Sequence, residues 1–303
     1  MSEIENENTG GRQDGTSGRT WFVTGSSRGL GRAVTVAALS AGDRVAATAR
    51  RPEQLADLAE EYGERILPLT LDVTDGTAAE AALRAARERF GRVDVVVNNA
   101  GYANLSPVET TSEEDFRRQF ETNFWGVYHV SKAALPLLRE QGGGTVVQIS
   151  SIGGRVGGTP GLGSYQAAKF AVDGLTRVLA TEAAPFGVRH VVVEPSGFAT
   201  DWAGASMEIP DVPEAYAPTV GAMVALLRGP GSPAGDPERA AEILVRVARS
   251  DTPPTHLLLG KDAADMALHH AQGQIAEAEA WREVSVSADF GTDGPVALPG
   301  NTA

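Results

Sequence analysis

Tyr165 and Lys169 are the two residues whose types and spacing most directly indicate chemistry in this sequence. They lie four positions apart, so on a helix both side chains share one face, one turn from each other. A lysine ammonium beside a phenol stabilises the phenolate and lowers the phenol pKa from its usual value of about 10. A tyrosine tuned in this way can exchange a proton with an alcohol near neutral pH. Taken alone, the pair would be one of many helical pairs with no special role.

The segment around this pair contains the elements that would position it. An apolar run over residues 145–149 predicts a buried strand, and a helical pattern follows from about residue 164 to 186. Ser150 and Ser151 end the predicted strand, and either hydroxyl could hydrogen-bond the substrate oxygen that the tyrosine protonates. We therefore expect a serine, a tyrosine and a lysine to meet at the end of this strand.

A glycine-rich turn near the N-terminus indicates a second function. The apolar run 20–24 predicts the first strand, and an alanine-rich helical pattern follows the turn as far as residue 41. Glycines between a strand and a helix let the backbone turn sharply and approach a pyrophosphate at the helix N-terminus. The context therefore predicts a dinucleotide site. Its candidate residues are Gly25, Ser27, Arg28, Gly29, Leu30 and Gly31.

The motifs along the chain resemble those of the short-chain dehydrogenase/reductase family over residues 18–262. The glycine turn reads Gly-x-x-x-Gly-x-Gly, as in that family, rather than Gly-x-Gly-x-x-Gly. An Asn-Asn-Ala-Gly element follows the predicted fourth strand, and an Asn-x-x-Gly element begins at Asn123. The serine with Tyr-x-x-x-Lys and a proline-glycine element from Pro195 come next, in the family's order.

The resemblance implies a catalytic set of four residues: Asn123, Ser151, Tyr165 and Lys169. Tyr165 would be the general acid, and Lys169 would lower its pKa and bind the nicotinamide ribose hydroxyls. Ser151 would orient and polarise the carbonyl oxygen, and Asn123 would support a proton-relay water. We choose Ser151 because it precedes Ile-Gly-Gly in the family fashion, with Ser150 as the alternative. Ser151 and Tyr165 are 14 positions apart, one more than in the family pattern, which indicates a one-residue insertion within 157–161.

The end of the predicted second strand bears on which cofactor binds. Dinucleotide folds that use NAD place an acid there for the ribose hydroxyls. This chain has Ala49 followed by Arg50, and Arg28 lies inside the glycine turn. Guanidinium groups pair bidentately with phosphate, so two arginines near the ribose suit a 2′-phosphate. Both could equally be ordinary surface arginines, but their placement favours NADP, as NADPH, over NAD.

Further cofactor contacts are implied at the ends of other strands. Asp72 would hydrogen-bond the adenine amino group, although it could equally cap the next helix, as Thr74 or Asp75 could. After the sixth strand, Ser196 replaces the first glycine of the family's Pro-Gly-x-x-x-Thr element. The replacement changes the turn that would place Thr200 against the cofactor. The implied contacts are Asp72, Val73, Asn99, Ala100, Gly101, Pro195, Gly197 and Thr200, beside Tyr165 and Lys169.

Alternating strand and helix patterns independently predict an α/β fold, a Rossmann-like doubly wound parallel sheet in a single domain. The resemblance implies the strand order 3-2-1-4-5-6-7. We expect the domain to span 19–284, between a disordered N-terminal tail (1–18) and a loose C-terminal tail (285–303). Residues 201–235 correspond to the family's substrate lid, and their apolar side chains would favour an apolar substrate. For most of these side chains, simple packing onto the core is the better explanation.

Composition narrows the classes of partner. The net charge of -13 argues against nucleic acid and anionic membranes. The chain has no cysteine, and the adjacent His269 and His270 cannot share a helix face, so we expect no metal site. With no apolar signal segment and no run of membrane-spanning length, a cytoplasmic protein is the expectation.

Together these features predict an NAD(P)-dependent oxidoreductase that interconverts a carbonyl and an alcohol by hydride transfer. Two alternatives remain open at this point. One is a dehydratase or epimerase on the same scaffold, although such members of the family carry longer C-terminal substrate domains. The other is a non-catalytic NADP-binding or regulatory protein, which would not need the tyrosine. The resemblance also implies a homodimer or homotetramer formed through the two long central helices.

Overall fold

Seven parallel strands form one sheet in the order β3-β2-β1-β4-β5-β6-β7 in the computed structural model, which describes residues 18–200, 207–229 and 235–299. This is the predicted doubly wound order. The strands are β1 (Thr20–Val23), β2 (Arg44–Ala49), β3 (Ile66–Thr70), β4 (Val95–Asn98), β5 (Gly144–Ile149), β6 (Val188–Pro195) and β7 (His256–Leu259). All six pairings are parallel, so the carboxyl ends of the strands lie along one edge of the sheet.

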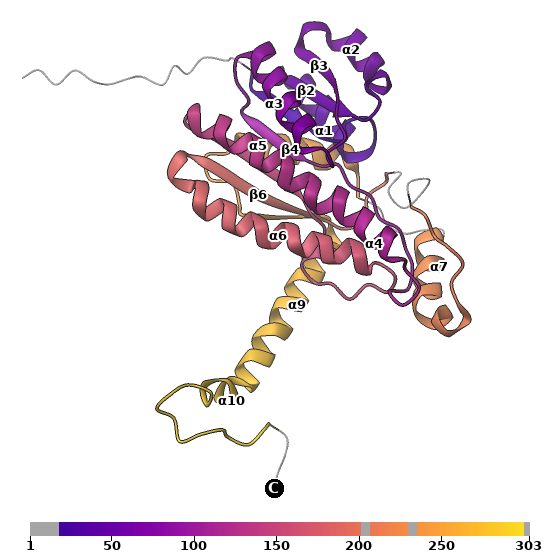
Figure 1. Cartoon of the computed structure of the whole chain (residues 1–303), viewed down its shortest axis with the longest axis vertical. Helices are drawn as coiled ribbons and strands as arrows, with labels where there is room; N and C mark the ends of the chain where they lie inside the picture. The colour runs from indigo at the N-terminus through magenta and orange to yellow at the C-terminus, as the bar shows by residue number, and fades with distance from the viewer. Residues whose placement is uncertain (1–17, 201–206, 230–234, 300–303) are drawn as a thin grey trace, which may run out of the picture.

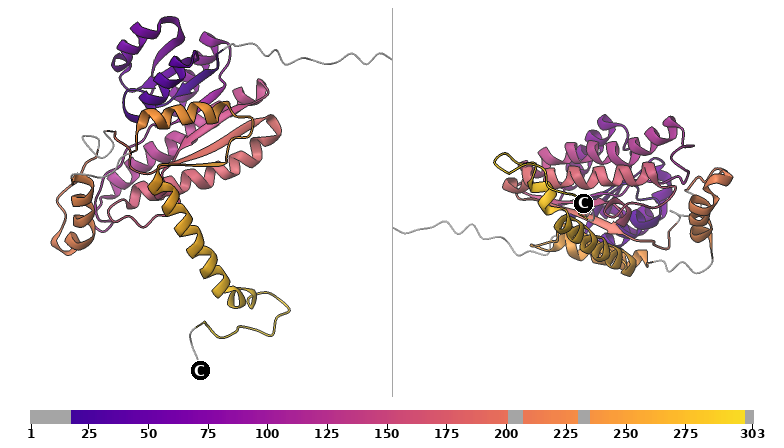
Figure 2. Two further views of the ribbon diagram at one scale, coloured as in Figure 1. Left: turned by 180° about the vertical axis from the view of Figure 1, so that it is seen from behind. Right: turned by 90° about the horizontal axis from the view of Figure 1, so that it is seen from below.

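Helices cover both faces of the sheet, which explains why the strands are apolar throughout rather than alternating (Figures 1 and 2). Trp21 and Val23 of β1 point into the core beneath α1 (Gly29–Ser40), α2 (Ala56–Tyr62) and α8 (Pro237–Arg249). Phe22, between them, points into the opposite core beneath α3 (Gly76–Phe90) and α5 (Gly126–Glu140). The alternating side chains of β1 therefore enter two separate cores, one on each face of the sheet.

Helix starts follow the caps that the sequence offers. Asp236 accepts hydrogen bonds from Glu238 N and Arg239 N at the start of α8, with Pro237 in the first turn. Asp75, rather than Asp72, caps α3. Asp72 instead accepts from the backbone N and the hydroxyl of Thr74 and remains exposed. Of the two uses considered for Asp72, the helix cap is therefore the wrong one.

The segment from residue 113 to 140 forms two α-helices joined by a wider turn. They are α4 (Glu113–Phe120) and α5, with a π-helical turn over Glu121–Trp125 between them. Such turns insert one extra residue into a helix and occur often at functional sites. Asn123 lies in this turn, so the wider turn sets the direction of its side chain.

The chain after β7 extends away from the sheet as α9 (Lys261–Ala280), followed by the short α10 (Arg282–Val286) (Figure 1). Only Ala263 and Ala267 of α9 are buried, because its later turns leave the body of the molecule. The predicted boundary between domain and tail, at 284/285, falls inside α10. The tail at 1–18 lies outside the described residues except for its last position. None of the helices within the described ranges is long and apolar enough to cross a membrane.

Candidate active site

Tyr165 and Lys169 lie on one face of α6 (Gly163–Ala183), as their spacing predicts, and both are buried, with 7% and 4% of their surface exposed. The ammonium of Lys169 is 5.6 Å from the centre of the Tyr165 ring. The same Nζ donates a 2.7 Å hydrogen bond to the carbonyl oxygen of Ile149, at the carboxyl end of β5. The lysine therefore joins the helix to the strand that ends in the two candidate serines.

Burial shifts the pKa values of both residues, and the shift on Tyr165 is opposite to the predicted one. Loss of hydration raises the pKa of Tyr165 to about 12, and a hydrogen bond with Ser151 only partly opposes this. Burial also lowers the pKa of Lys169 to about 8. The expected lowering of the tyrosine pKa by the lysine is thus wrong for this structure, because the phenolate would be desolvated in an apolar pocket. The tyrosine is held as a neutral phenol at pH 7.

The structure distinguishes the two serines. The Ser151 hydroxyl is hydrogen-bonded to Tyr165 and accepts a 3.1 Å hydrogen bond from Gly153 N. The Ser150 hydroxyl is buried and donates to the backbone carbonyl of Lys169 at 3.3 Å. Ser151 is therefore the serine that meets the tyrosine, whereas Ser150 ties the end of β5 to α6.

Asn123 is fully buried and completes the predicted set from the π-helical turn. Its Nδ2 donates to the carbonyl oxygens of Tyr102 and Gln119, both at 2.9 Å, and its Oδ1 accepts from Tyr102 N. A Cβ at Gly101 would lie 2.6 Å from Asn123 Oδ1 and 3.7 Å from Lys169 Nζ. The asparagine amide and the lysine ammonium therefore approach the same short backbone segment.

The glycine turn and the Asn-Asn-Ala-Gly element lock together at the ends of β1 and β4. Thr24 Oγ1 accepts from the backbone N of Asn99 at 2.9 Å and of Ala100 at 3.0 Å. The Asn99 Nδ2 donates in turn to the carbonyl oxygens of Thr24 and Gly25. A Cβ at Gly31 would collide with both that amide and the Gly25 carbonyl, so only glycine fits. Thr24 was not among the predicted residues, although its position before the glycine turn marks it.

This arrangement suits a nucleotide pyrophosphate. Gly25 and Gly29 have positive φ angles of 69° and 56°, which turn the backbone sharply before α1. The first turn of α1 has no side-chain cap, so its amide groups face the site, and such amides bind phosphate oxygens. Thr200 is also close, since a Cβ at Gly29 would lie 3.5 Å from the Thr200 Cβ. The residues present therefore fit a dinucleotide.

The other predicted cofactor contacts also lie at the carboxyl edge of the sheet. Arg28 and Arg50 are exposed, one after β1 and the other after β2, and these two strands are neighbours. Asp72 and Val73 follow β3, and Pro195 ends β6. The sheet topology therefore brings the predicted cofactor residues together from the ends of β1, β2, β3, β4 and β6, with both arginines beside β1 and β2.

A third, apolar cluster surrounds the tyrosine. Tyr165 is buried together with Ala103, Leu105, Leu162, Met207 and Val220. The described part of the predicted lid, 207–229, reaches this cluster through Met207 and Val220 and contains α7 (Ala222–Arg228). Leu105 N donates to the carbonyl oxygen of Glu208 at 3.0 Å, which fixes the lid against the segment after β4. The sequence reasoning missed Ala103 and Leu105, whose signal is an apolar pair just after Asn-Asn-Ala-Gly.

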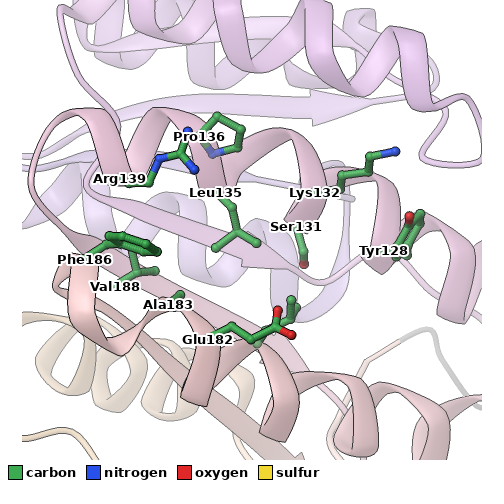
Figure 3. Close-up of a pocket in the computed structure, with 11 residues that line it drawn as sticks. Tyr128, Ser131, Lys132, Leu135, Pro136, Arg139, Glu182, Ala183, Phe186 and Val188 are labelled. Carbon is green, nitrogen blue, oxygen red and sulfur yellow. The ribbon is translucent and has the colours of Figure 1, made fainter.

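A groove of about 270 Å³ lies between α5 and α6, outside this site (Figure 3). Its lining includes Lys132, Leu135 and Arg139 from α5 and Phe186 beyond α6, and none of the predicted site residues. Arg139 stacks over the Phe186 ring at 5.8 Å.

Comparison with known proteins identifies the family. The model of the short-chain dehydrogenases matches residues 19–209. The chain belongs to the short-chain dehydrogenase/reductase family. It is 50% identical over 271 residues to the oxidoreductase BOA17 of Botryotinia fuckeliana. The aligned region covers 89% of this chain and 98% of that protein. The family assignment makes this chain an oxidoreductase with a nicotinamide-binding fold.

Solved structures of the short-chain dehydrogenase/reductase fold agree with this architecture. A short-chain dehydrogenase from Streptomyces avermitilis superposes with a TM-score of 0.84 at 39% identity, covering 91% of this chain and 100% of that one. An alcohol dehydrogenase from Thermococcus sibiricus, complexed with 5-hydroxy-NADP, gives 0.66 at 28% identity, covering 80% and 95%. These matches support the Rossmann-like parallel sheet of this structure.

Proposed function

We propose that this chain is an NADPH-dependent reductase that interconverts the carbonyl of an apolar ketone or aldehyde and the corresponding alcohol. The observation that carries the proposal is the hydrogen bond between Ser151 and Tyr165, with Lys169 on the next turn of the same helix. A protein that only bound the nucleotide would not need a buried phenol aligned with a hydroxyl donor.

The roles follow from the protonation states. Tyr165, with its pKa raised to about 12 by burial, is a phenol at neutral pH and supplies the proton to the developing alkoxide. Ser151 donates to the same oxygen and polarises the carbonyl. Lys169 supports the reaction as a cation held close to the phenol ring. NADPH, held by the glycine turn and by α1, supplies the hydride when bound.

Two features favour particular ligands. Arg28 and Arg50 support NADP over NAD, because guanidinium groups suit the 2′-phosphate and no acid ends β2. The apolar cluster around Tyr165 supports an apolar substrate, because a polar molecule would lose hydration there without hydrogen-bonding partners. Asn123 supports a proton-relay water in this scheme.

The proposal also includes the oligomeric state of the protein and its location in the cell. We place a homodimer or homotetramer interface on α5 and α6, where exposed Phe186 and the groove between these helices offer apolar surface. We place the enzyme in the cytoplasm. A single domain from residue 19, with a tail at each end, is part of the same proposal, and its C-terminal limit moves from 284 to the end of α10 at Val286.

The test follows NADPH absorbance across a panel of apolar ketones and aldehydes. Wild type should consume NADPH with at least one of them, and Tyr165→Phe should lose about 100-fold or more in kcat while still binding NADPH. Tyr62→Phe, which removes a hydroxyl at the end of α2, is the matched control and should keep full activity. Retained turnover in Tyr165→Phe would remove the tyrosine from its role. NADPH binding without turnover of any carbonyl would favour the regulatory alternative.

A further inference from the structure

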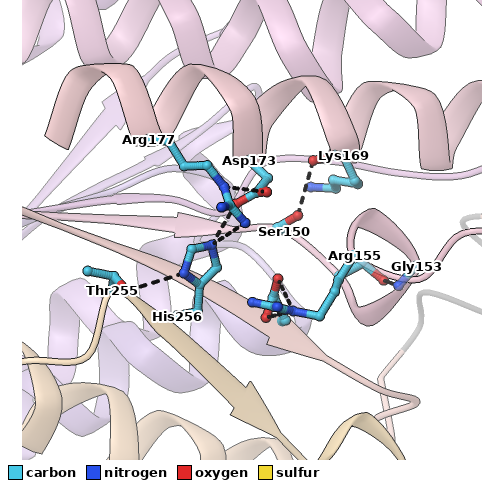
Figure 4. A network of polar contacts seen from close by, with 10 residues as sticks. Ser150, Gly153, Arg155, Lys169, Asp173, Arg177, Thr255 and His256 are labelled. Atoms are coloured by element: carbon cyan, nitrogen blue, oxygen red, sulfur yellow. Dashed lines mark hydrogen bonds and ion pairs between the residues drawn. The ribbon is translucent and has the colours of Figure 1, made fainter. Parts of the chain in front are cut away.

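Five charged or titratable side chains form a network beside α6 that the proposed mechanism does not use (Figure 4). They are Arg155, Asp173, Arg177, Glu194 and His256. Asp173 and Arg177 continue the face of α6 that carries Tyr165 and Lys169, at successive intervals of four residues. The network therefore begins one turn beyond the catalytic lysine.

Glu194 is the most buried member, with 1% of its side chain exposed at the carboxyl end of β6. The Arg155 Nε reaches both of its carboxylate oxygens, at 3.0 and 2.9 Å. Burial raises the pKa of Glu194, and the Arg155 guanidinium opposes that shift. A carboxylate so buried is costly unless it is paired, so Arg155 is its essential partner.

The same residues could suggest a metal site, because ligand atoms of Asp173, Glu194 and His256 lie within 4.8 Å of one another. Each carboxylate, however, already has a guanidinium partner. Arg177 Nε donates to Asp173 Oδ2 at 2.9 Å, and Arg155 holds Glu194. His256 Nε2 lies 2.7 Å from the other Asp173 oxygen. The two arginines balance the two carboxylates, so the group is an ion-pair network.

Arg155 stands at the end of the turn that orients the catalytic serine. A 3₁₀ turn, Ile152–Gly154, follows Ser151, and Ser151 caps it by accepting from Gly153 N. Arg155 N closes the turn on the Ile152 carbonyl at 3.0 Å. The side chain of Arg155 then reaches across to β6, so fixing the arginine fixes the turn and the serine that caps it.

Glu194 stands at an equally sensitive place. It immediately precedes Pro195, where β6 ends and a group of predicted cofactor contacts begins. One ion pair thus joins the strand-end turn that carries the hydroxyl donor to the strand end that borders the cofactor.

We propose that Arg155 and Glu194 are positioning residues that clamp the Ser151 turn to the end of β6 and hold the Ser151 hydroxyl against Tyr165. The kinetic consequence of the clamp rests on the proposed function, whereas its effect on the turn does not. Neither residue touches the reacting atoms, and both act through Ser151.

Hydrogen exchange of the free protein tests the clamp without any substrate. Arg155→Ala and Glu194→Gln should accelerate amide exchange in a peptide covering residues 150–157. Arg249→Ala is the matched control, because it breaks another ion pair to a buried carboxylate, Arg249–Asp43 at 2.7 Å with Asp43 1% exposed. That control should lower the unfolding temperature without changing exchange in 150–157. Unchanged exchange in both clamp variants would overturn the proposal, whatever the enzyme's activity.

Kinetics separates positioning from simple stability. Arg155→Ala should lower kcat by up to about 100-fold, because small misplacements of a reacting group are costly, while the Kd for NADPH stays near that of wild type. Arg155→Lys keeps the positive charge and should therefore retain part of the kcat that Arg155→Ala loses.

Two results in this second experiment bear on different claims. If folded Arg155→Ala keeps the kcat of wild type, the positioning role is wrong. If wild type turns over no carbonyl, the proposed function fails, and hydrogen exchange still decides whether the clamp holds the serine turn.

Discussion

At the scale of single residues, the site depends on side chains whose surroundings change their chemistry. Tyr165 has a raised pKa and Lys169 a lowered one for the same reason, since each loses hydration on burial. Ser151 opposes the shift on the tyrosine through its hydrogen bond. The residue types fit proton transfer, but the direction of each pKa shift is set by how deeply the side chain is buried.

The cofactor preference is a prediction at this scale. Arg50→Asp places a carboxylate at the end of β2, where it would repel a 2′-phosphate and accept hydrogen bonds from ribose hydroxyls. A charged hydrogen bond contributes about 1.5–3 kcal/mol. The ratio of kcat/KM for NADPH to that for NADH should therefore fall by about 10-fold or more. Steady-state kinetics with both cofactors measures this ratio, and an unchanged ratio would remove the basis for NADP.

At the scale of elements, short sequence signals decide where helices begin, and tertiary contacts decide how they are interrupted. Asp75 and Asp236 cap α3 and α8 with two backbone hydrogen bonds each. The π-helical turn between α4 and α5 has no comparable signal. Its residue Asn123 binds the backbone around Tyr102, a contact between segments about 20 positions apart.

The cap of α3 gives a prediction at this scale. Asp75→Ala removes the acceptor for Thr77 N and Ala78 N and should lower the free energy of unfolding by about 1 kcal/mol. Urea unfolding followed by circular dichroism measures the change. Glu88→Ala, at an exposed position of the same helix, is the control and should alter stability by less than about 0.5 kcal/mol. Equal losses in both variants would show that the cap contributes nothing specific.

At the scale of the whole molecule, stability rests on two cores that cover both faces of one sheet. One polar residue stands out in this interior. His190 of β6 is 5% exposed, and neither of its ring nitrogens has a hydrogen-bond partner among the described residues. Burial lowers its pKa to about 4 from 6.5, so the folded protein holds it neutral.

This histidine predicts how stability depends on pH. Below pH 6.5 the unfolded chain gains a proton that the folded protein accepts only near pH 4, so stability is complete above 6.5 and falls between 6.5 and about 4. The loss from this group is up to about 3 kcal/mol. Urea unfolding at pH 7.5 and pH 5 should show a smaller difference for His190→Leu than for wild type. An equal difference in the two proteins would assign the acid sensitivity to other groups.

Much of this protein could be predicted from contiguous residues. Strand and helix periodicity, the glycine turn and the aspartate and proline at the start of α8 are local signals, and the sheet order followed from the family that these motifs resemble. The four-residue spacing of Tyr165 and Lys169 is by itself enough to place both on one helix face. These features depend on backbone geometry over a few consecutive residues, so the local sequence is enough to predict them.

Only the tertiary structure decided how distant residues meet and how burial changes them. The sequence motif favoured Ser151 over Ser150, but the hydrogen bond of the Ser151 hydroxyl with the Tyr165 phenol is seen only in the folded chain. The raised pKa of Tyr165 depends on apolar side chains from the segment after β4 and from the lid. The contact between Arg155 and Glu194 joins positions 39 apart. Desolvation and long-range pairing depend on the packed surroundings of a group, and no short stretch of sequence contains them.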